Sequence, residues 1–95
     1  MTQPGDGVTA TAVREATFPK PPFGKRGYDE GSVNDLLALA ARRLDGRGYL
    51  RAADIRDVVF RPAPLLSRGF DRGAVDEFVA RLAAAVAELE ASDPV

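Results

Sequence analysis

Two proline-rich segments of the chain place apolar side chains beside basic ones, a combination that suits contact with an acidic surface. The residues concerned are Phe23, Lys25 and Arg26 in the first segment and Leu65, Leu66 and Arg68 in the second. An apolar side chain that leaves water gains about 1.5–3 kcal/mol, and a basic one near an anionic leaflet gains about 1 kcal/mol. Because one segment alone would bind a membrane weakly, useful membrane binding needs both segments together. The alternative is that the segments are structural loops that pack against the protein or contact a protein partner.

Catalytic chemistry is not indicated. The chain has no cysteine and no histidine, which excludes disulfides, thiolate nucleophiles, imidazole bases and most zinc or iron sites. The neighbouring carboxylates Asp76 and Glu77 would face apart on a helix instead of converging. No serine has a suitable base, and no glycine-rich loop follows a strand. The sequence therefore predicts a protein that is not an enzyme, with no cofactor and no metal site.

Charge and hydropathy limit the classes of binding partner and the cellular compartment that the sequence supports. The formal net charge is −1, which does not favour nucleic acid. A helix-turn-helix motif needs a turn of three or four residues, whereas about a dozen residues separate Val59 from Asp71. No apolar run approaches the roughly 20 residues of a membrane-spanning helix, and the polar N-terminal residues do not have the pattern expected of a secretory signal. We expect a cytoplasmic protein that does not bind nucleic acid.

An internal repeat organises the sequence. A shift of 42 residues places Phe18 on Phe60 and residues 26–33 on residues 68–75 without a gap. A period in this range indicates a duplicated supersecondary unit. The predicted divisions are a disordered tail at 1–7, repeat 1 at 8–44, a connecting turn at 45–49, repeat 2 at 50–89 and a C-terminal tail at 90–95.

Each repeat is predicted to begin with a short helix and to continue into a proline-rich loop. The short helices are expected at 10–16 and 52–59, with Asp54 and Asp57 suited to an N-terminal turn. Prolines then disfavour both helix and strand, because they lack the amide donor and fix the backbone. They occupy positions 19, 21, 22, 62 and 64.

A longer amphipathic helix is predicted to follow each loop. Asp29 and Asp71 suit the N-cap position, and apolar residues then recur every three or four positions as far as Leu44 and about Ala91. No useful stretch alternates with period two, so the predicted fold is all-α, a small pseudo-symmetric bundle. The residues expected to pack between the two long helices are Val33, Leu37, Leu44, Val75, Val79 and Leu82.

Several further residues have expected structural roles. Phe18 and Phe60 are expected in the core, beside the short helices, and Tyr28 and Phe70 are expected to fix each loop onto the next helix. Arg14 and Arg56 either pair with acids across the repeat or lie on a solvated helix face. The complete structural motif comprises Phe18, Gly27, Tyr28, Asp29, Phe60, Gly69, Phe70 and Asp71.

The segment from Phe18 to Glu30, with the apolar stripe that follows, resembles the N-terminal domain of DivIVA, a bacterial scaffold of cell poles and division sites. Actinobacterial versions look closest. Residues 53–60 also resemble the short helix that precedes the family's loop. The resemblance covers about 8–44 and 50–89, so it recurs in both repeats.

This resemblance implies a cytoplasmic module that binds membrane peripherally and dimerises as a parallel helical pair. The family's loop offers one apolar and one basic residue to lipid. Arg26 and Arg68 match the basic position, and the apolar role passes to Phe23, Leu65 or Leu66. The expected partners are a second copy of the chain, other cell-division or cell-wall proteins, and the inner leaflet of the cell membrane.

Two hypotheses remain open from the sequence. The first is a DivIVA-like scaffold or adaptor for polar growth or cell division, in which two tandem repeats build within one chain something like the family's dimer. The second is a soluble helical protein-interaction module that does not bind membrane. A chain this short leaves little net stability once ordering entropy is subtracted, so we expect dimerisation to stabilise it.

Overall fold

The computed structural model describes residues 8–92 and has four α-helices in that range. They are α1 (Ala10–Glu15), α2 (Glu30–Leu44), α3 (Ala52–Arg56) and α4 (Arg72–Ser92). The predicted all-α class is confirmed. The predicted tail at 1–7 and the last three residues lie outside the described range, whereas residues 90–92, assigned from sequence to the C-terminal tail, belong to α4.

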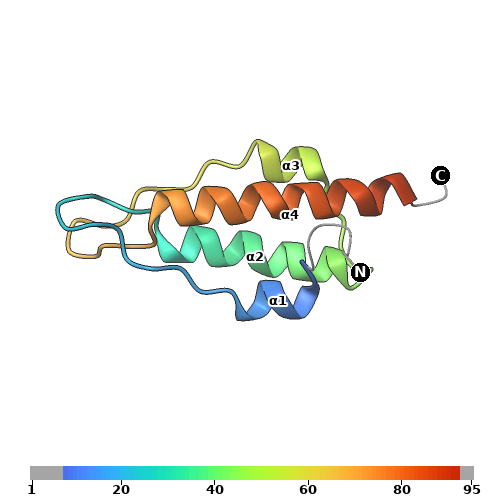
Figure 1. Ribbon diagram of the computed structural model, residues 1–95, viewed down its shortest axis with the longest axis horizontal. Helices are drawn as coiled ribbons and strands as arrows, with labels where there is room; N and C mark the ends of the chain where they lie inside the picture. Colours follow the sequence, from blue (N-terminus) through green and yellow to red (C-terminus); the bar gives the residue numbers. More distant parts are fainter. Residues whose placement is uncertain (1–7, 93–95) are drawn as a thin grey trace.

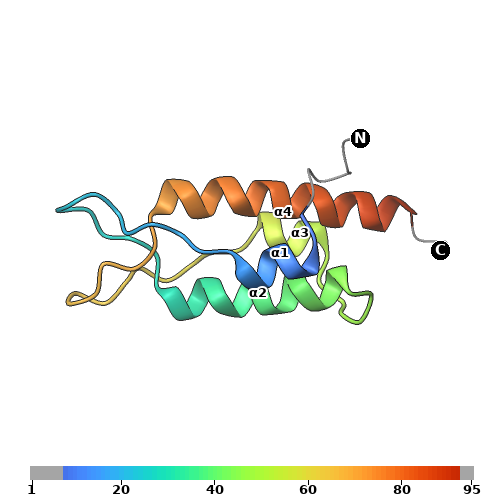
Figure 2. The same ribbon diagram turned by 60° about the horizontal axis from the view of Figure 1, so that its bottom comes forward.

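The two long helices lie side by side and run in the same direction (Figures 1 and 2). The short helix α1 packs on α2, and α3 packs on α4. Both short helices lie toward the C-terminal ends of the long ones, and the chain between each short and long helix travels to the opposite end and returns (Figure 1). This arrangement brings the two proline-rich loops to one end of the molecule.

Aspartates cap both long helices, as the sequence predicted. Asp29 accepts a hydrogen bond from the backbone N–H of Ser32 at 2.9 Å. Asp71 accepts one from the backbone N–H of Ala74, also at 2.9 Å. Each carboxylate satisfies a backbone donor that the helix itself leaves unpaired. The two caps therefore fix where each loop ends and each long helix begins.

The predicted end of α3 is wrong. The helix stops at Arg56 and not at Val59, because Val58 and Val59 are β-branched and favour extended backbone. Asp54 lies in the first turn as expected. Asp57 instead lies at the C-cap, where its charge opposes the helix dipole.

The core forms between the long helices and is sealed by the short ones. Of the six residues predicted there, Val33, Leu37, Val75 and Leu82 are buried, whereas Leu44 and Val79 are only half-buried at its edge. The short helices contribute Val13 and Ile55, both almost fully buried. Leu36 and Val86 of the long helices are also buried, as are the alanines Ala40 and Ala41 on α2 and Ala83 and Ala85 on α4.

Candidate functional site

Both loops project beyond the N-terminal ends of α2 and α4 at the same end of the molecule (Figures 1 and 2). We call residues 20–26 and 62–68 together the tip. Every residue predicted to contact a membrane or partner lies in the tip. The sequence patterns placed these residues in two loops, and the fold brings the loops together.

Paired backbone hydrogen bonds join the loops at their base. Tyr28 N–H donates to the carbonyl oxygen of Phe70 at 2.9 Å, and Phe70 N–H donates to that of Tyr28 at 3.0 Å. These two residues form an isolated antiparallel β-bridge. We call this contact, with the bonds described next, the loop seam.

A second pair of bonds extends the loop seam. Asp29 N–H donates to the carbonyl oxygen of Arg61 at 2.8 Å, and Asp71 N–H donates to that of Pro19 at 2.9 Å. Under the 42-residue shift Asp29 corresponds to Asp71, and Pro19 corresponds to Arg61, so the two bonds are equivalent. Each loop therefore donates one of these hydrogen bonds to the other loop's side and accepts the equivalent one.

Gly27 and Gly69 are required by the close approach of the loops. A Cβ atom on Gly27 would lie 2.6 Å from the carbonyl oxygen of Arg68. One on Gly69 would lie 2.7 Å from the Cβ atom of Ala63, and Gly69 also has a left-handed φ of +71°. Neither position accepts a side chain without moving backbone.

The basic residues of the motif reach across the loop seam. Arg26 Nε donates to the carbonyl oxygen of Ala63 at 2.5 Å, and the guanidinium of Arg68 donates to the carbonyl oxygen of Pro21. Pro21 and Ala63 are themselves buried. The two arginines, expected from the sequence to meet lipid, therefore hold the loops together in this structure while each residue stays exposed overall.

The apolar residues of the tip face solvent. Phe23 is 97% exposed, Leu65 is 87% exposed, and Leu66 is fully exposed. Lys25 is exposed, and its ammonium group makes no hydrogen bond or ion pair with a described residue, whereas Lys20 pairs with Glu30 at 2.9 Å. The tip thus presents a bare apolar surface with one uncommitted cation beside it.

Aromatic rings anchor each loop to the helical body. Phe18 contacts Phe70 at a centroid distance of 5.2 Å, and Tyr28 contacts Phe60 at 5.1 Å. Phe60 is buried as predicted, while the other three rings are half-buried against the core. Phe18 also meets Phe78 of α4 at 5.6 Å. Phe18, predicted in the core, therefore lies at its edge, and the ring contacts of Tyr28 and Phe70 join the two repeats.

Three polar contacts at the loop base were missed by the sequence reasoning. The Tyr28 hydroxyl donates to Asp76 at 2.7 Å, and this hydrogen bond, with burial, raises the pKa of Tyr28 above its ordinary value of 10.0. Arg72 lies over the Tyr28 ring at 5.3 Å and donates to the carbonyl oxygen of Arg26. Under the 42-residue shift Arg72 corresponds to a glutamate. This reversal of charge between the repeats was the sequence signal that could have indicated a special role for Arg72.

The third contact joins Arg61 to the cap of α2. Its guanidinium lies 3.2 Å from Asp29, and its Nε donates to the Ser32 hydroxyl at 3.0 Å. Hydrogen bonds from the Ser32 backbone and side chain, and then the charge of Arg61, lower the pKa of Asp29. The cap carboxylate therefore stays ionised and links the second loop to the start of α2.

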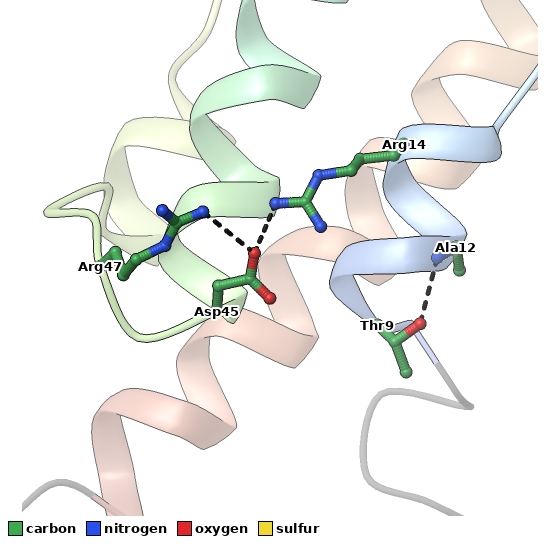
Figure 3. Close-up of polar contacts among 5 residues, drawn as sticks. All are labelled: Thr9, Ala12, Arg14, Asp45 and Arg47. Atoms are coloured by element: carbon green, nitrogen blue, oxygen red, sulfur yellow. Dashed lines mark hydrogen bonds and ion pairs between the residues drawn. The ribbon is translucent and has the colours of Figure 1, made fainter.

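The opposite end of the molecule has a different polar cluster, centred on Asp45 (Figure 3). The guanidinium of Arg14 on α1 binds this carboxylate, and Arg47 approaches it at 3.5 Å. The hydrogen bond from Arg14 is the main reason that the pKa of Asp45 is lowered. Of the two alternatives left open by the sequence, the Arg14 side chain is paired, whereas the Arg56 side chain makes no polar contact with a described residue.

The described part of the chain contains no group of three or more acidic side chains arranged to hold a metal ion. None of its helices is both long enough and apolar enough to cross a membrane. No family model, curated protein or solved structure matches the chain.

Proposed function

We propose that this chain is a non-enzymatic adaptor of the DivIVA type for polar growth or cell division. In this proposal its two repeats build one pseudo-symmetric unit, which presents both loops to the inner, anionic face of the cell membrane. The observation that carries the proposal is the tip, where Phe23, Leu65 and Leu66 are exposed on two loops that the loop seam joins at one end of the molecule.

Equivalent contacts in the two loops support the pseudo-symmetric unit. Arg26 binds the carbonyl of Ala63, and 42 residues later Arg68 binds the carbonyl of Pro21. The same shift relates the two pairs of backbone bonds described for the loop seam, and it relates the Phe18–Phe70 ring contact to the Tyr28–Phe60 contact. The parallel direction of α2 and α4 also fits the parallel helical pair that the family resemblance implies.

Energetic estimates favour insertion of apolar side chains over attraction between charges. Burying Phe23, Leu65 and Leu66 would contribute roughly 5–9 kcal/mol before the cost of immobilisation. The loop seam already orders the loops, which reduces that cost. Lys25 adds about 1 kcal/mol near an anionic leaflet, so membrane binding should depend only weakly on salt.

The proposed partners follow from the same resemblance. A homodimer would present the tip twice and so raise the avidity for a membrane. Other division or cell-wall proteins would bind elsewhere on the unit.

A second candidate is a soluble protein-interaction module that does not bind membrane. It is favoured by one observation: Arg26 and Arg68, at the family's lipid-contacting position, donate to loop carbonyls instead. In this alternative the tip contacts a protein.

Vesicle flotation tests the proposal. We expect the protein to float with vesicles that contain about a third anionic lipid and to bind purely zwitterionic ones about fivefold more weakly, because the roughly 1 kcal/mol from Lys25 is gained only beside negative charge. Tyr49→Ser is the matched control, since Tyr49 is 94% exposed in the turn between α2 and α3, far from the tip. Failure of the parent chain to float at low salt would exclude membrane binding and leave the soluble module.

A further inference from the structure

A hollow of about 540 Å³ lies on the side of the molecule between α3, the extended chain after it and α4. We call it the α4 groove. Its apolar lining is Ile55, Val58, Val59, Phe60, Val79, Ala80 and Ala83. Val59 is 89% exposed, although it is β-branched and apolar. No residue of the tip lines this groove.

A smaller hollow, of about 270 Å³, lies at the corresponding place on α2. We call it the α2 hollow, and its lining is Val13, Arg14, Ala16, Asn34, Leu37 and Ala38. Every one of these residues stands 42 positions before a residue that lines the α4 groove. The two sites are therefore equivalent places in the two repeats, and the second is twice as large.

The equivalent arginines of the two sites differ in what they bind. Arg14 at the α2 hollow pairs with Asp45 of its own chain. The Arg56 guanidinium at the α4 groove makes no hydrogen bond or ion pair with a described residue, and the position that corresponds to Asp45 is Ala87. The first repeat neutralises its cation internally, and the second leaves its cation at the rim of an open apolar groove.

The remaining charges of the α4 groove do not offset Arg56. The Asp76 carboxylate already accepts a hydrogen bond from the Tyr28 hydroxyl at 2.7 Å. Arg72 stands over the Tyr28 ring and adds a second positive charge to the lining. The charges of Arg72 and Asp76 therefore offset each other, and the uncommitted guanidinium of Arg56 leaves the lining with one net positive charge above an apolar floor.

We propose that the α4 groove binds an acidic peptide segment of a partner protein. Apolar side chains of that segment cover Val79, Ala80 and Ala83, and a carboxylate pairs with Arg56. This binding site lies on the side of the adaptor, so it deepens the proposed function by naming a partner surface. It does not depend on membrane binding by the tip.

Three labelled peptides test this proposal by fluorescence anisotropy. They share one pattern of leucines and carry glutamate, glutamine or lysine at the intervening positions. We expect the glutamate peptide to bind, the glutamine peptide to bind about threefold to fivefold more weakly, and the lysine peptide not to bind. Arg56→Gln should lower the affinity for the glutamate peptide by a similar factor. The variant should then bind the glutamate and glutamine peptides equally well.

A pair of helix-surface variants locates the site. Ala80 and Ala38 are exposed alanines at equivalent positions of α4 and α2. Ala80→Glu should abolish peptide binding by filling the groove with negative charge, whereas Ala38→Glu should leave it unchanged. Both variants should keep the parent helicity, because glutamate is a good helix former.

Four results would overturn the inference: no binding of any peptide at millimolar concentration, equal affinity of the glutamate and lysine peptides, loss of binding in Ala38→Glu as well, or self-association of the parent chain that Ala80→Glu removes. The last result would identify a second copy of the chain as the occupant. None of these outcomes bears on vesicle flotation, so the two proposals fail separately.

Discussion

The tip and the side faces of this protein show two different consequences of one duplication. At the loop seam, contacts recur at the same spacing in both repeats, because each loop must satisfy the other's backbone groups. On the side faces, Arg14 is paired and Arg56 is not. The contrast indicates that the seam is constrained by the fold, whereas the sides tolerate differences that can carry separate functions.

Alanine in place of the seam glycines should have the largest effect on stability. Gly27→Ala and Gly69→Ala each force a Cβ atom into backbone or buried side chain, and we expect each to destabilise the fold by about 2 kcal/mol or more. Gly73→Ala in α4 is the control. Its nearest neighbour would lie at an ordinary 3.4 Å, so helix propensity should make it stabilising by about 0.5–1 kcal/mol. Urea unfolding measures all three, and mild effects at both seam positions would contradict the close approach.

The Tyr28 hydroxyl should have a smaller effect that depends on pH. Tyr28→Phe removes the hydrogen bond to Asp76, which contributes up to about 1 kcal/mol at this half-exposed site. Because the pKa of Tyr28 is raised in the folded state, the contribution is complete below pH 10.0 and is lost as pH rises through the folded pKa. Thermal unfolding of parent and variant between about pH 8 and 12 tests this. Phe70→Tyr, at the equivalent position, has no such aspartate and should show no alkaline difference of this kind.

The smallest expected effect is the difference in thermal stability between variants of Arg14 and Arg56, the equivalent arginines of the two side faces. Arg14→Ala should lower the unfolding midpoint, whereas Arg56→Ala should leave it unchanged, because only Arg14 binds a carboxylate. The pKa of Asp45 is lowered in the folded state, so the contribution of the pair is present above the unfolded value of 3.8 and is lost as pH falls through the folded pKa. Melting curves at about pH 6 and pH 2 should therefore show a gap between parent and Arg14→Ala that closes at the lower pH. A gap that persists in acid would show that Arg14 acts through packing.

Local signals in the sequence predicted most of the fold. The caps Asp29 and Asp71, the prolines and the apolar stripe act within a few residues of the structure that they determine, so the long helices were placed closely. The end of α3 was missed because Val58 and Val59 continue an apolar run that helix periodicity alone does not terminate. Extended backbone there depends on Phe60 reaching the core.

The candidate site was predicted in part. The periodicity identified both loops and their apolar residues, but not the contacts of Arg61 with Asp29 or of Arg72 with Tyr28. Those contacts join different repeats, and they depend on how the repeats are placed in space. The role of Arg26 at the loop seam was hidden for the same reason, since the carbonyl that it binds lies 37 residues away in sequence.

The central claim is that the two loops form one binding surface, and vesicle affinity of single-loop variants tests it most directly. Phe23→Ser alters the first loop, and Leu65→Ser with Leu66→Ser alters the second. All three side chains are exposed, so these changes should alter stability by no more than about 0.5 kcal/mol. If the loops act together, either variant should lose most of the binding to anionic vesicles. Binding that falls only by half in each, or that survives both changes combined, would contradict the account.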